Sequence, residues 1–360
     1  MPGIYISYPF CAQKCTYCNF ASGVFPENLE RDYLTALRSE IASAHFPWTP
    51  ETVYLGGGTP SRMDLADLHQ ILAAIPGRPW REATIEAAPG SLTPDRVSGW
   101  LRAGINRVSL GVQSFIPREL ARTGRKHSVE TVAAEIDLLR ATGIANINID
   151  LIAGLPGQTM ASWRESLSWI EKLAPPHVSV YMLEIDEDSR LGNEILLNGK
   201  RYGAPEIPAD ELIAEMYETA VDELRRLGIH RYEISNFARP GFESAHNLKY
   251  WRLEPYFGFG ADAHSFDGVE RWQNVETAAE YVARSPKLSS TPANPTEERF
   301  FVGLRLTEGI RPNPEEWSRF EAPISRFLSE GLLARDGDKL RLTNRGVLLS
   351  NEIFSEFITT

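Results

Sequence analysis

The chain has 360 residues, of which 42% are hydrophobic and 24% charged, and its net charge at pH 7 is −11. These are ordinary globular values, and a chain of this length can bury a barrel-sized core with a smaller appended domain. The acidic balance argues against general nucleic-acid binding, which needs Lys and Arg to neutralise phosphates. No signal-peptide pattern opens the chain and no apolar run has the length of a membrane span, so we expect a cytoplasmic protein.

Short β-rich segments alternate with amphipathic helical segments through the first two thirds of the chain. The predicted strands are residues 4–8, 52–56, 83–87, 107–112, 146–152 and 177–183. Two intervening helices are marked at both ends, by Thr93 and Ser128 as N-caps and by Gly104 and Gly143 as C-terminal glycines. Strand–helix repetition predicts parallel strands with right-handed crossovers. Six units, rather than eight, predict an α/β fold with an incomplete parallel (β/α)6 barrel.

The pattern changes after about residue 233. Residues 232–266 are rich in glycine, aromatic and polar residues, and residues 292–295 resemble a linker between two prolines. Thr296 is predicted to cap a helix through residue 304. The segments that follow are predicted as a helix at 324–331, a hairpin at 332–342 and a helix at 344–357. This order predicts a small winged-helix-like α+β module, and because it is not basic we expect a packing or partner role rather than DNA binding.

These patterns divide the chain into three predicted parts. We expect a barrel over residues 1–235, a Gly- and aromatic-rich extension over 236–290, and a C-terminal domain over 291–360.

The only three cysteines, Cys11, Cys15 and Cys18, lie in the run YPFCAQKCTYCNF, directly after the first predicted strand. Thiolates at C-x3-C-x2-C spacing can hold three irons of a [4Fe–4S] cluster and leave the fourth iron open to a small molecule, whereas electron-transfer clusters are normally closed by four cysteines. The alternatives are buried thiols that only pack, a zinc site completed by a histidine such as His45, and a disulfide framework. The spacing, on a loop after a strand, favours the cluster.

Polar and glycine residues recur at the C-terminal ends of the predicted strands, where barrel enzymes carry their chemistry. The run GGGTP at residues 56–60 follows the second strand, and its glycines would let the backbone approach a ligand, although a plain strand-to-helix turn explains the run equally well. Neither a dinucleotide fingerprint nor a phosphate-binding loop is present. Glu86 ends the third strand, Gln113 ends the fourth, and Asp150 lies in the fifth. We expect these three side chains to converge on the barrel mouth.

Six motifs spread over nearly the whole chain carry a family resemblance. They are Y-I-S-Y-P-F-C-x3-C-x2-C-N-F, G-G-G-T-P-S, L-G-V-Q-S-F, N-I-D-L-I-A-G-L-P-G-Q-T, Y-E-I-S-N-F-A-R-P-G and H-N-L-K-Y-W. Together they resemble the radical S-adenosylmethionine (SAM) proteins of the oxygen-independent coproporphyrinogen III oxidase group, in particular the HemW-type haem-chaperone branch. The resemblance implies a [4Fe–4S] cluster on Cys11, Cys15 and Cys18 whose open iron chelates SAM. It also implies reductive cleavage of SAM to methionine and a 5′-deoxyadenosyl radical, which the protein shields and aims.

The resemblance also assigns the SAM contacts. Tyr5 and Tyr17 match positions flanking the cofactor, Gly57, Gly58 and Thr59 match the turn that receives its methionine part, and Glu86, Gln113, Arg125 and Asp150 match polar contacts. A carboxylate suits an ammonium group or ribose hydroxyls, and an arginine suits a carboxylate. Arg125 also lies in the basic run 122–126, so a plain surface position is the alternative for it.

Departures from the family pattern separate its branches. Phe20 stands where the oxidases carry another cysteine, and the oxidases' N-terminal extension before the first strand is missing. Both differences argue against decarboxylation of coproporphyrinogen. Ser7 replaces a family histidine and Ala88 replaces a family asparagine, and these changes bear on SAM geometry and cluster tuning.

The run HNLKYW at residues 246–251 matches the H-N-x-x-Y-W motif of the haem-chaperone branch. Imidazole is a common haem-iron ligand and aromatic rings stack on porphyrins, so we expect His246 as an axial ligand beside Tyr250 and Trp251. Positive charge for the haem propionates would come from Arg231, Arg239, Lys249 and Arg252. His264 is a second ligand candidate, and a structural role within a loop is the alternative for His246.

Three functions follow from these expectations. The first is a haem chaperone that binds cluster and SAM, receives electrons from a low-potential flavodoxin- or ferredoxin-type donor, and delivers haem to respiratory membrane proteins from a peripheral position at the inner membrane, without binding nucleic acid. The second is a radical SAM enzyme such as a methyltransferase, a cyclopropanase or a haem-degrading enzyme. The third, coproporphyrinogen oxidation, is disfavoured by Phe20.

Overall fold

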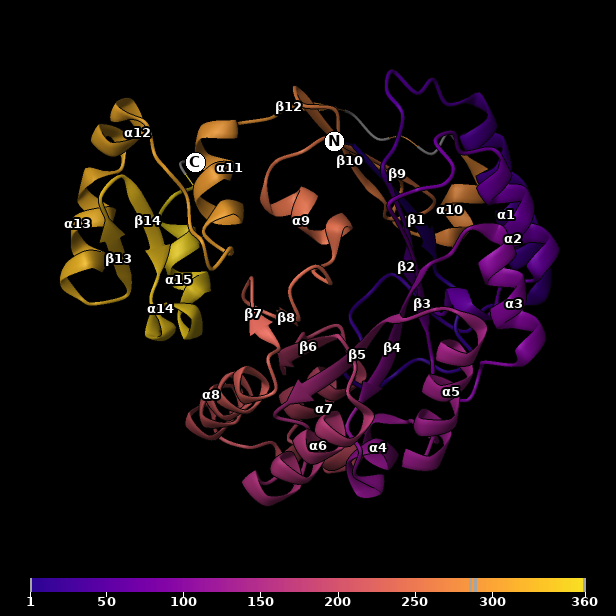
Figure 1. Cartoon of the computed structure of the whole chain (residues 1–360), viewed down its shortest axis with the longest axis horizontal. Helices are drawn as coiled ribbons and strands as arrows, with labels where there is room; N and C mark the ends of the chain where they lie inside the picture. The colour runs from indigo at the N-terminus through magenta and orange to yellow at the C-terminus, as the bar shows by residue number, and fades with distance from the viewer. Residues whose placement is uncertain (1, 285–286, 288–289, 359–360) are drawn as a thin grey trace.

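The computed structural model describes residues 2–284, 287 and 290–358. In this part of the chain a twelve-stranded sheet runs in the order β12-β11-β10-β9-β1-β2-β3-β4-β5-β6-β8-β7, and a separate hairpin pairs β13 with β14 (Figure 1). Its central strands are β1 (Gly3–Tyr8), β2 (Thr52–Gly57), β3 (Glu82–Ala87), β4 (Arg107–Gln113), β5 (Asn146–Ala153) and β6 (His177–Met182). All six are parallel and each boundary lies within one residue of its predicted place, so the incomplete parallel barrel is confirmed.

Helices α1 to α6 connect the parallel strands, α7 and α8 follow the last of them, and the helices cover the outside of the sheet (Figure 1). They are α1 (Glu27–Ser43), α2 (Leu65–Ala73), α3 (Pro94–Ala103), α4 (Pro117–Thr123), α5 (Val129–Thr142), α6 (Met160–Leu173), α7 (Arg190–Leu196) and α8 (Asp210–Arg226), with short 3-10 turns at Pro60–Arg62 and Arg201–Glu206. Thr93 and Ser128 accept the predicted capping hydrogen bonds, and Gly104 and Gly143 end α3 and α5 with φ of 95° and 105°. No described helix combines the length and apolar character needed to cross a membrane.

The two faces of the sheet differ in chemistry because side chains alternate along each strand. On the outer face, Ile4, Leu55, Ile85, Val108, Ile149 and Val180 are completely or almost completely buried in the hydrophobic core. The other face carries Tyr54, Glu86, Ser109, Asp150 and Ser179 at intervening positions of the same strands. The helices therefore hold the sheet from outside through aliphatic packing, which leaves the concave face for polar groups.

The segment after the barrel adds strands to both edges of the same sheet. At the β6 edge, β8 (Asn236–Ala238) pairs with β6 and with β7 (His230–Arg231). At the other edge, β9 (Tyr256–Phe259) pairs in parallel with β1, and β10 (His264–Phe266), β11 (Glu270–Gln273) and β12 (Thr291–Pro292) continue as antiparallel strands. Two helices, α9 (Ala245–Trp251) and α10 (Ala278–Ala283), lie in the same segment. The Gly-rich region thus completes the sheet.

The C-terminal part consists of helices around the β13–β14 hairpin (Figure 1). Its elements are α11 (Pro295–Gly303), α12 (Pro314–Arg319), α13 (Glu321–Ser329), β13 (Leu333–Asp336), β14 (Lys339–Leu342), α14 (Asn344–Leu348) and α15 (Ser350–Ser355). The hairpin is where the sequence predicts it. Two local predictions were wrong: Asn294, rather than Thr296, caps α11, and the final helix is interrupted at Leu349.

Candidate functional site

The three cysteines lie on a loop that leaves β1 at the C-terminal ends of the parallel strands. Hydrogen bonds from Cys11 N to Gly23 O (2.8 Å) and from Gly23 N to Pro9 O (2.9 Å) close the base of this loop. Farther along, Thr16 N donates to Thr123 O at the end of α4 (3.3 Å), and Leu191 N at the start of α7 donates to Thr16 O (2.8 Å). The backbone therefore fixes the loop at its base and at its centre.

The cysteine thiols are free and half-buried. Burial raises the pKa of Cys11, an effect that the hydroxyls of Thr59 and Ser22 oppose, and Cys18 Sγ lies 3.8 Å from Ser22 Oγ. Among the described residues no three His, Cys, Asp or Glu side chains are close enough to share one metal ion. A cubane cluster does not require such proximity, because each thiolate binds a different iron.

The GGGTP turn packs against the start of the cysteine loop. Gly58 N donates to Tyr8 O (2.8 Å) and Thr59 N donates to Phe10 O (3.0 Å), so this turn is bonded to the segment that enters the loop. A Cβ atom on Gly58 would lie 2.7 Å from Tyr8 O and 2.9 Å from Phe10 N, a contact that only glycine avoids. Gly57 has φ of 101°, a left-handed conformation that also favours glycine. These glycines are required by close backbone packing.

Glu86 and Tyr54 form a hydrogen-bonded pair on the concave face. Tyr54 Oη donates to Glu86 Oε1 at 2.9 Å, and the ring of Tyr54 stacks against that of Tyr5 with 6.2 Å between centroids. Burial raises the pKa of Glu86 to about 7; the negative charge of Asp150 adds to the effect, and the Tyr54 hydroxyl and the Gly57 N–H oppose it. Glu86 therefore titrates close to neutral pH.

Gln113 and Arg125 converge over Gly111 in β4. A Cβ on Gly111 would lie 3.1 Å from Gln113 Nε2 and 3.4 Å from a terminal nitrogen of Arg125. Gln113 follows an irregularity in the β4–β5 register and has φ of 71°, a strained conformation for a non-glycine residue and one that redirects its side chain. Although burial alone would disfavour its charge, nearby Tyr17 and Cys15 hold the pKa of Arg125 above its ordinary value. Arg125 therefore points into the site, and the alternative of a plain surface residue is wrong.

Asp150 belongs to a polar network across β4, β5 and β6. Its carboxylate accepts hydrogen bonds from Asn148 Nδ2 (2.7 Å) and Ser109 Oγ (3.3 Å). Asn148 Nδ2 also donates to Ser179 Oγ at 2.9 Å. Burial raises the pKa of Asp150. The network fixes the position of the carboxylate on the concave face.

Two buried polar atoms beside the cysteine loop have no hydrogen-bond partner among the described residues. They are Tyr17 Oη and Arg125 Nε, in side chains close enough to interact with each other but without a hydrogen bond of good geometry at these two atoms. Buried polar atoms are normally satisfied, so two in one place indicate room for a polar ligand. Together with the carboxylates of Glu86 and Asp150 and the three thiols, they make a donor set that fits an iron–sulfur cluster with an amino-acid-bearing cofactor such as SAM.

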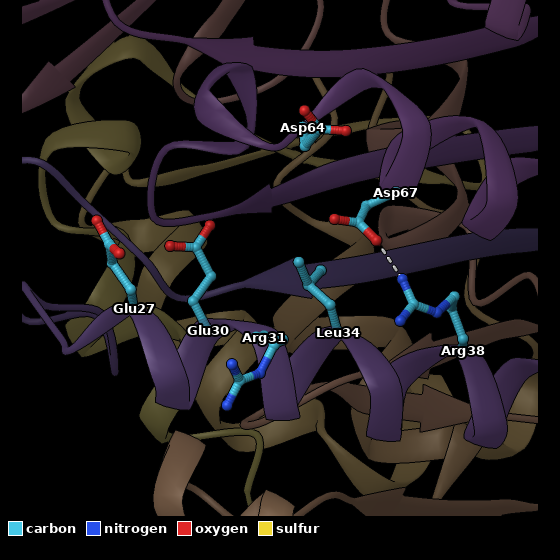
Figure 2. Close-up of a pocket in the computed structure, with 7 residues that line it drawn as sticks. All are labelled: Glu27, Glu30, Arg31, Leu34, Arg38, Asp64 and Asp67. Carbon is cyan, nitrogen blue, oxygen red and sulfur yellow. Dashed lines mark hydrogen bonds and ion pairs between the residues drawn. The ribbon is translucent and has the colours of Figure 1, made fainter.

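A separate hollow of about 180 Å³ lies between α1 and α2, away from the concave face (Figure 2). It is lined by Glu27, Glu30, Arg31, Leu34, Arg38, Asp64 and Asp67. Three of its acids already have partners: Glu30 accepts from the Tyr8 hydroxyl, Asp67 pairs with Arg38, and Asp64 caps α2. These contacts are structural, because they join α1 to β1 and α2 and cap α2.

The HNLKYW run forms α9, and His246 in it is only 1% exposed. Both ring nitrogens have partners, Nδ1 with Thr52 Oγ1 and Nε2 with Tyr250 Oη, each at 2.8 Å. Burial, with Lys249 and Arg107 nearby, lowers the pKa of His246 to about 3, so the imidazole is neutral. Trp251 packs its ring against Arg305, whose guanidinium lies 4.5 Å from the ring centroid. In this arrangement haem iron could reach His246 only after a hydrogen bond is broken, and its role as a ligand stays a prediction.

The basic residues expected near the haem propionates are mostly engaged within the protein. Lys249 is buried and pairs with Glu51 at 2.8 Å, and Arg252 pairs with Glu308 at 3.3 Å. Arg231 donates to Asn344 Oδ1 at 2.9 Å, whereas Arg239 is exposed. His264, the second ligand candidate, is exposed in β10. Of the two histidines, His264 has the more accessible imidazole.

Tyr54, Asn148, Ser109 and Ser179 shape the site but were absent from the sequence-based set. Each points to the concave face, like the predicted contacts. Asn148 lies two residues before Asp150 in β5, and Ser109 and Ser179 are strand partners of Glu86 and Asp150. The signal that could have found them is the period of two, because in a barrel wall a polar residue between buried aliphatic residues must face inward.

Family models and known proteins match this chain over most of its length. The family described as Radical SAM superfamily matches residues 5–170, and the HemN C-terminal domain matches residues 291–349. The chain is 34% identical to heme chaperone HemW of Bacillus subtilis over 99% of both chains. It is 35% identical to heme chaperone HemW of Mycobacterium tuberculosis over 98% of this chain and 93% of that protein.

A solved structure has the same fold. Coproporphyrinogen III oxidase (HemN) from Escherichia coli, titled a radical SAM enzyme, superposes with a TM-score of 0.84 over 99% of this chain and 90% of that chain. The sequence identity is 20%, so this likeness concerns the fold alone.

Proposed function

Because the chain belongs to the HemW family of radical SAM proteins, we propose that it binds haem and passes it to other proteins as a haem chaperone. The observation that carries the proposal is the similarity to proteins named heme chaperones over almost the entire chain. Radical SAM membership implies a [4Fe–4S] cluster and SAM as cofactors.

The residues that would hold these cofactors are those gathered at the barrel mouth. Cys11, Cys15 and Cys18 would ligate three irons of the cluster. The SAM contacts would come from Tyr5, Tyr17, Gly57, Gly58, Thr59, Glu86, Gln113, Arg125 and Asp150. When bound, the cluster and SAM would supply one-electron chemistry. The chain's own groups would place a carboxylate at Glu86, a guanidinium at Arg125 and a backbone turn at Gly57–Thr59 around the ligand.

Phe20 separates this proposal from coproporphyrinogen oxidation. Phe20 stands two residues after Cys18, where a further cysteine would be needed, and the residue is 65% exposed. A phenyl ring provides neither a thiolate nor a proton donor, so it cannot replace that cysteine in any chemical role. The proposed activity is therefore haem handling without decarboxylation.

The proposal also covers the partners of the protein and its location. The electron donor is a low-potential protein of the flavodoxin or ferredoxin type, and the haem acceptors are respiratory membrane proteins. The chain acts in the cytoplasm and is peripheral to the inner membrane when it delivers haem. Its net charge of −11 supports the absence of nucleic acid among its partners.

A haem titration tests the proposal. The anaerobically reconstituted full-length protein should bind about one haem per chain and show a Soret band of protein-bound haem. His264→Ala and His246→Gln, compared in the same titration, show which imidazole contributes, because His264 is exposed whereas both nitrogens of His246 are engaged. Failure of the wild-type protein to bind haem would refute the chaperone function.

A further inference from the structure

Helix α9 closes the N-terminal end of the barrel. Gly3, Thr52 and Glu82 begin three adjacent strands in register, and α9 lies across them. The buried Glu82 carboxylate accepts hydrogen bonds from Ala245 N (2.8 Å), His246 N (3.1 Å) and Ser244 Oγ (3.2 Å). The three bonds attach the start of α9 to β3, so the helix forms a floor beneath the concave face.

The floor is packed directly onto the β1 backbone. A Cβ on Gly3 would lie 2.8 Å from Thr52 Oγ1 and 3.1 Å from His246 Nδ1. A neutral imidazole has one donor and one acceptor, and the hydroxyls of Thr52 and Tyr250 can take either role. Both ring nitrogens are satisfied in this way, which fixes the plane of the His246 ring.

The His246 ring packs against Tyr54, the residue that is hydrogen-bonded to Glu86. The His246 and Tyr54 rings stack with 5.3 Å between centroids and an interplanar angle of 29°. Tyr5 also stacks on Tyr54, whose hydroxyl donates to Glu86 Oε1 at 2.9 Å. A Cβ on Gly56 would lie about equally close to Glu86, Tyr54 and Tyr5, at 3.1–3.2 Å. The four side chains of His246, Tyr54, Tyr5 and Glu86 are therefore in close contact from α9 to the barrel mouth.

We propose that His246 is a positioning residue for SAM binding: its ring, held by Thr52 and Tyr250, fixes Tyr54 and thereby the Glu86 carboxylate. This inference rests on the proposed function of Glu86 as a SAM contact. It gives the HNLKYW run a role in the barrel that does not require contact with haem.

The pH dependence of SAM binding provides a readout that folding alone would not change. The groups that face Glu86 from the surrounding elements are Tyr5, Tyr54, Arg107, Asp150, Tyr181 and Tyr250. Burial raises the pKa of Glu86 to about 7, and the bond from Tyr54 opposes that rise. The carboxylate suits the cationic groups of SAM, so binding should weaken as pH falls through this range. Loss of the Tyr54 bond should raise the Glu86 pKa further and move the midpoint upward.

The test measures SAM dissociation constants of the reconstituted full-length protein from about pH 6 to pH 9, a range that spans the Glu86 titration. Tyr54→Phe removes only the hydroxyl and should move the midpoint upward by about one pH unit. His246→Ala should weaken SAM binding roughly tenfold near pH 7 and shift the midpoint in the same direction. His246→Gln retains a donor and an acceptor and should restore part of the affinity. His230→Ala, at an exposed histidine, is the matched control and should behave as wild type.

The outcomes distinguish the inference from the proposed function. Unchanged affinity and midpoint in His246→Ala, with normal SAM binding by wild type, would overturn the positioning role alone, whatever Tyr54→Phe shows. Loss of haem from His246→Ala with an unchanged SAM profile would instead make His246 a haem ligand and also overturn it. Absence of SAM binding by the wild type would remove the SAM site and the inference with it. If His246→Ala fails to fold, His246→Gln decides, because it keeps the donor and acceptor but removes the ring that stacks on Tyr54; a wild-type SAM profile in His246→Gln would then overturn the positioning role.

Discussion

Substitution of Gly58 by alanine should displace the cysteine loop. The new Cβ would lie 2.7 Å from Tyr8 O and 2.8 Å from Pro9 C, where ordinary contact begins at 3.4 Å, so the backbone must move by roughly 0.7 Å. Both neighbours are backbone atoms at the entrance to the loop, and no side-chain rotation relieves the contact. Overpacking of this kind costs about 1–3 kcal/mol. We expect a lower unfolding temperature, fewer than the full complement of about four irons per chain after reconstitution, and SAM binding weakened by tenfold or more.

Gly143→Ala is the matched control for this experiment. Gly143 also has a left-handed φ, of 105°, but a Cβ there meets no atom within 4 Å. Its substitution should cost about 1 kcal/mol of backbone strain at the end of α5 and leave iron content and SAM affinity unchanged. The reasoning would be refuted if Gly58→Ala retained wild-type iron content and SAM affinity, since the loop would then tolerate the shift.

Three further predictions concern the cluster, the reaction and the attachment of helix α9 to β3. Cys15→Ala should abolish the visible absorbance of the reconstituted protein, because a methyl group cannot ligate iron; a colourless wild-type protein loaded with zinc would contradict the cluster assignment. With Phe20 in the oxidase cysteine position, the wild-type protein should not convert coproporphyrinogen III to protoporphyrinogen IX in the presence of SAM and reductant, as chromatography of the products would show. Glu82→Ala should lower the free energy of unfolding by about 2–4 kcal/mol in urea titrations, because it leaves the buried donors of Ser244 and Ala245 unpaired; an unchanged midpoint would mean that water replaces the carboxylate.

Local signals were sufficient to predict the parallel strands and the ends of two helices. Thr93 and Gly104 act within one helical turn of their own positions, so their roles are visible in the sequence. The pairing of β9 with β1 joins Tyr256 to Gly3 and depends on contacts across the whole chain, which no short window contains. The Gly- and aromatic-rich region was therefore recognised by composition, while its place in the sheet was not.

In the candidate site, too, some features could be predicted from nearby residues and others depend on contacts between distant ones. Residues Glu86, Gln113 and Asp150 could be placed at the mouth because parallel strands end at the same edge. The Tyr54–Glu86 hydrogen bond could not be predicted, since it depends on the exact register of β2 and β3. For His246, the motif specifies the residue type but not whether its nitrogens are open or already bonded to Thr52 and Tyr250.

Helix α9 links the barrel to the C-terminal part of the chain through opposite ends of one motif. His246 bonds to Thr52 of β2, while Trp251 packs against Arg305, and Thr307 N donates to Tyr232 O at 3.0 Å near the same junction. A helix of seven residues is not stable by itself in water, so its geometry must come from these contacts on both sides. The C-terminal part also contacts the sheet directly, through Arg231 with Asn344 and Arg271 with Glu298, so α9 is one of several links between the two. Among these links, α9 is the one whose His246 ring stacks on Tyr54, the residue bonded to Glu86.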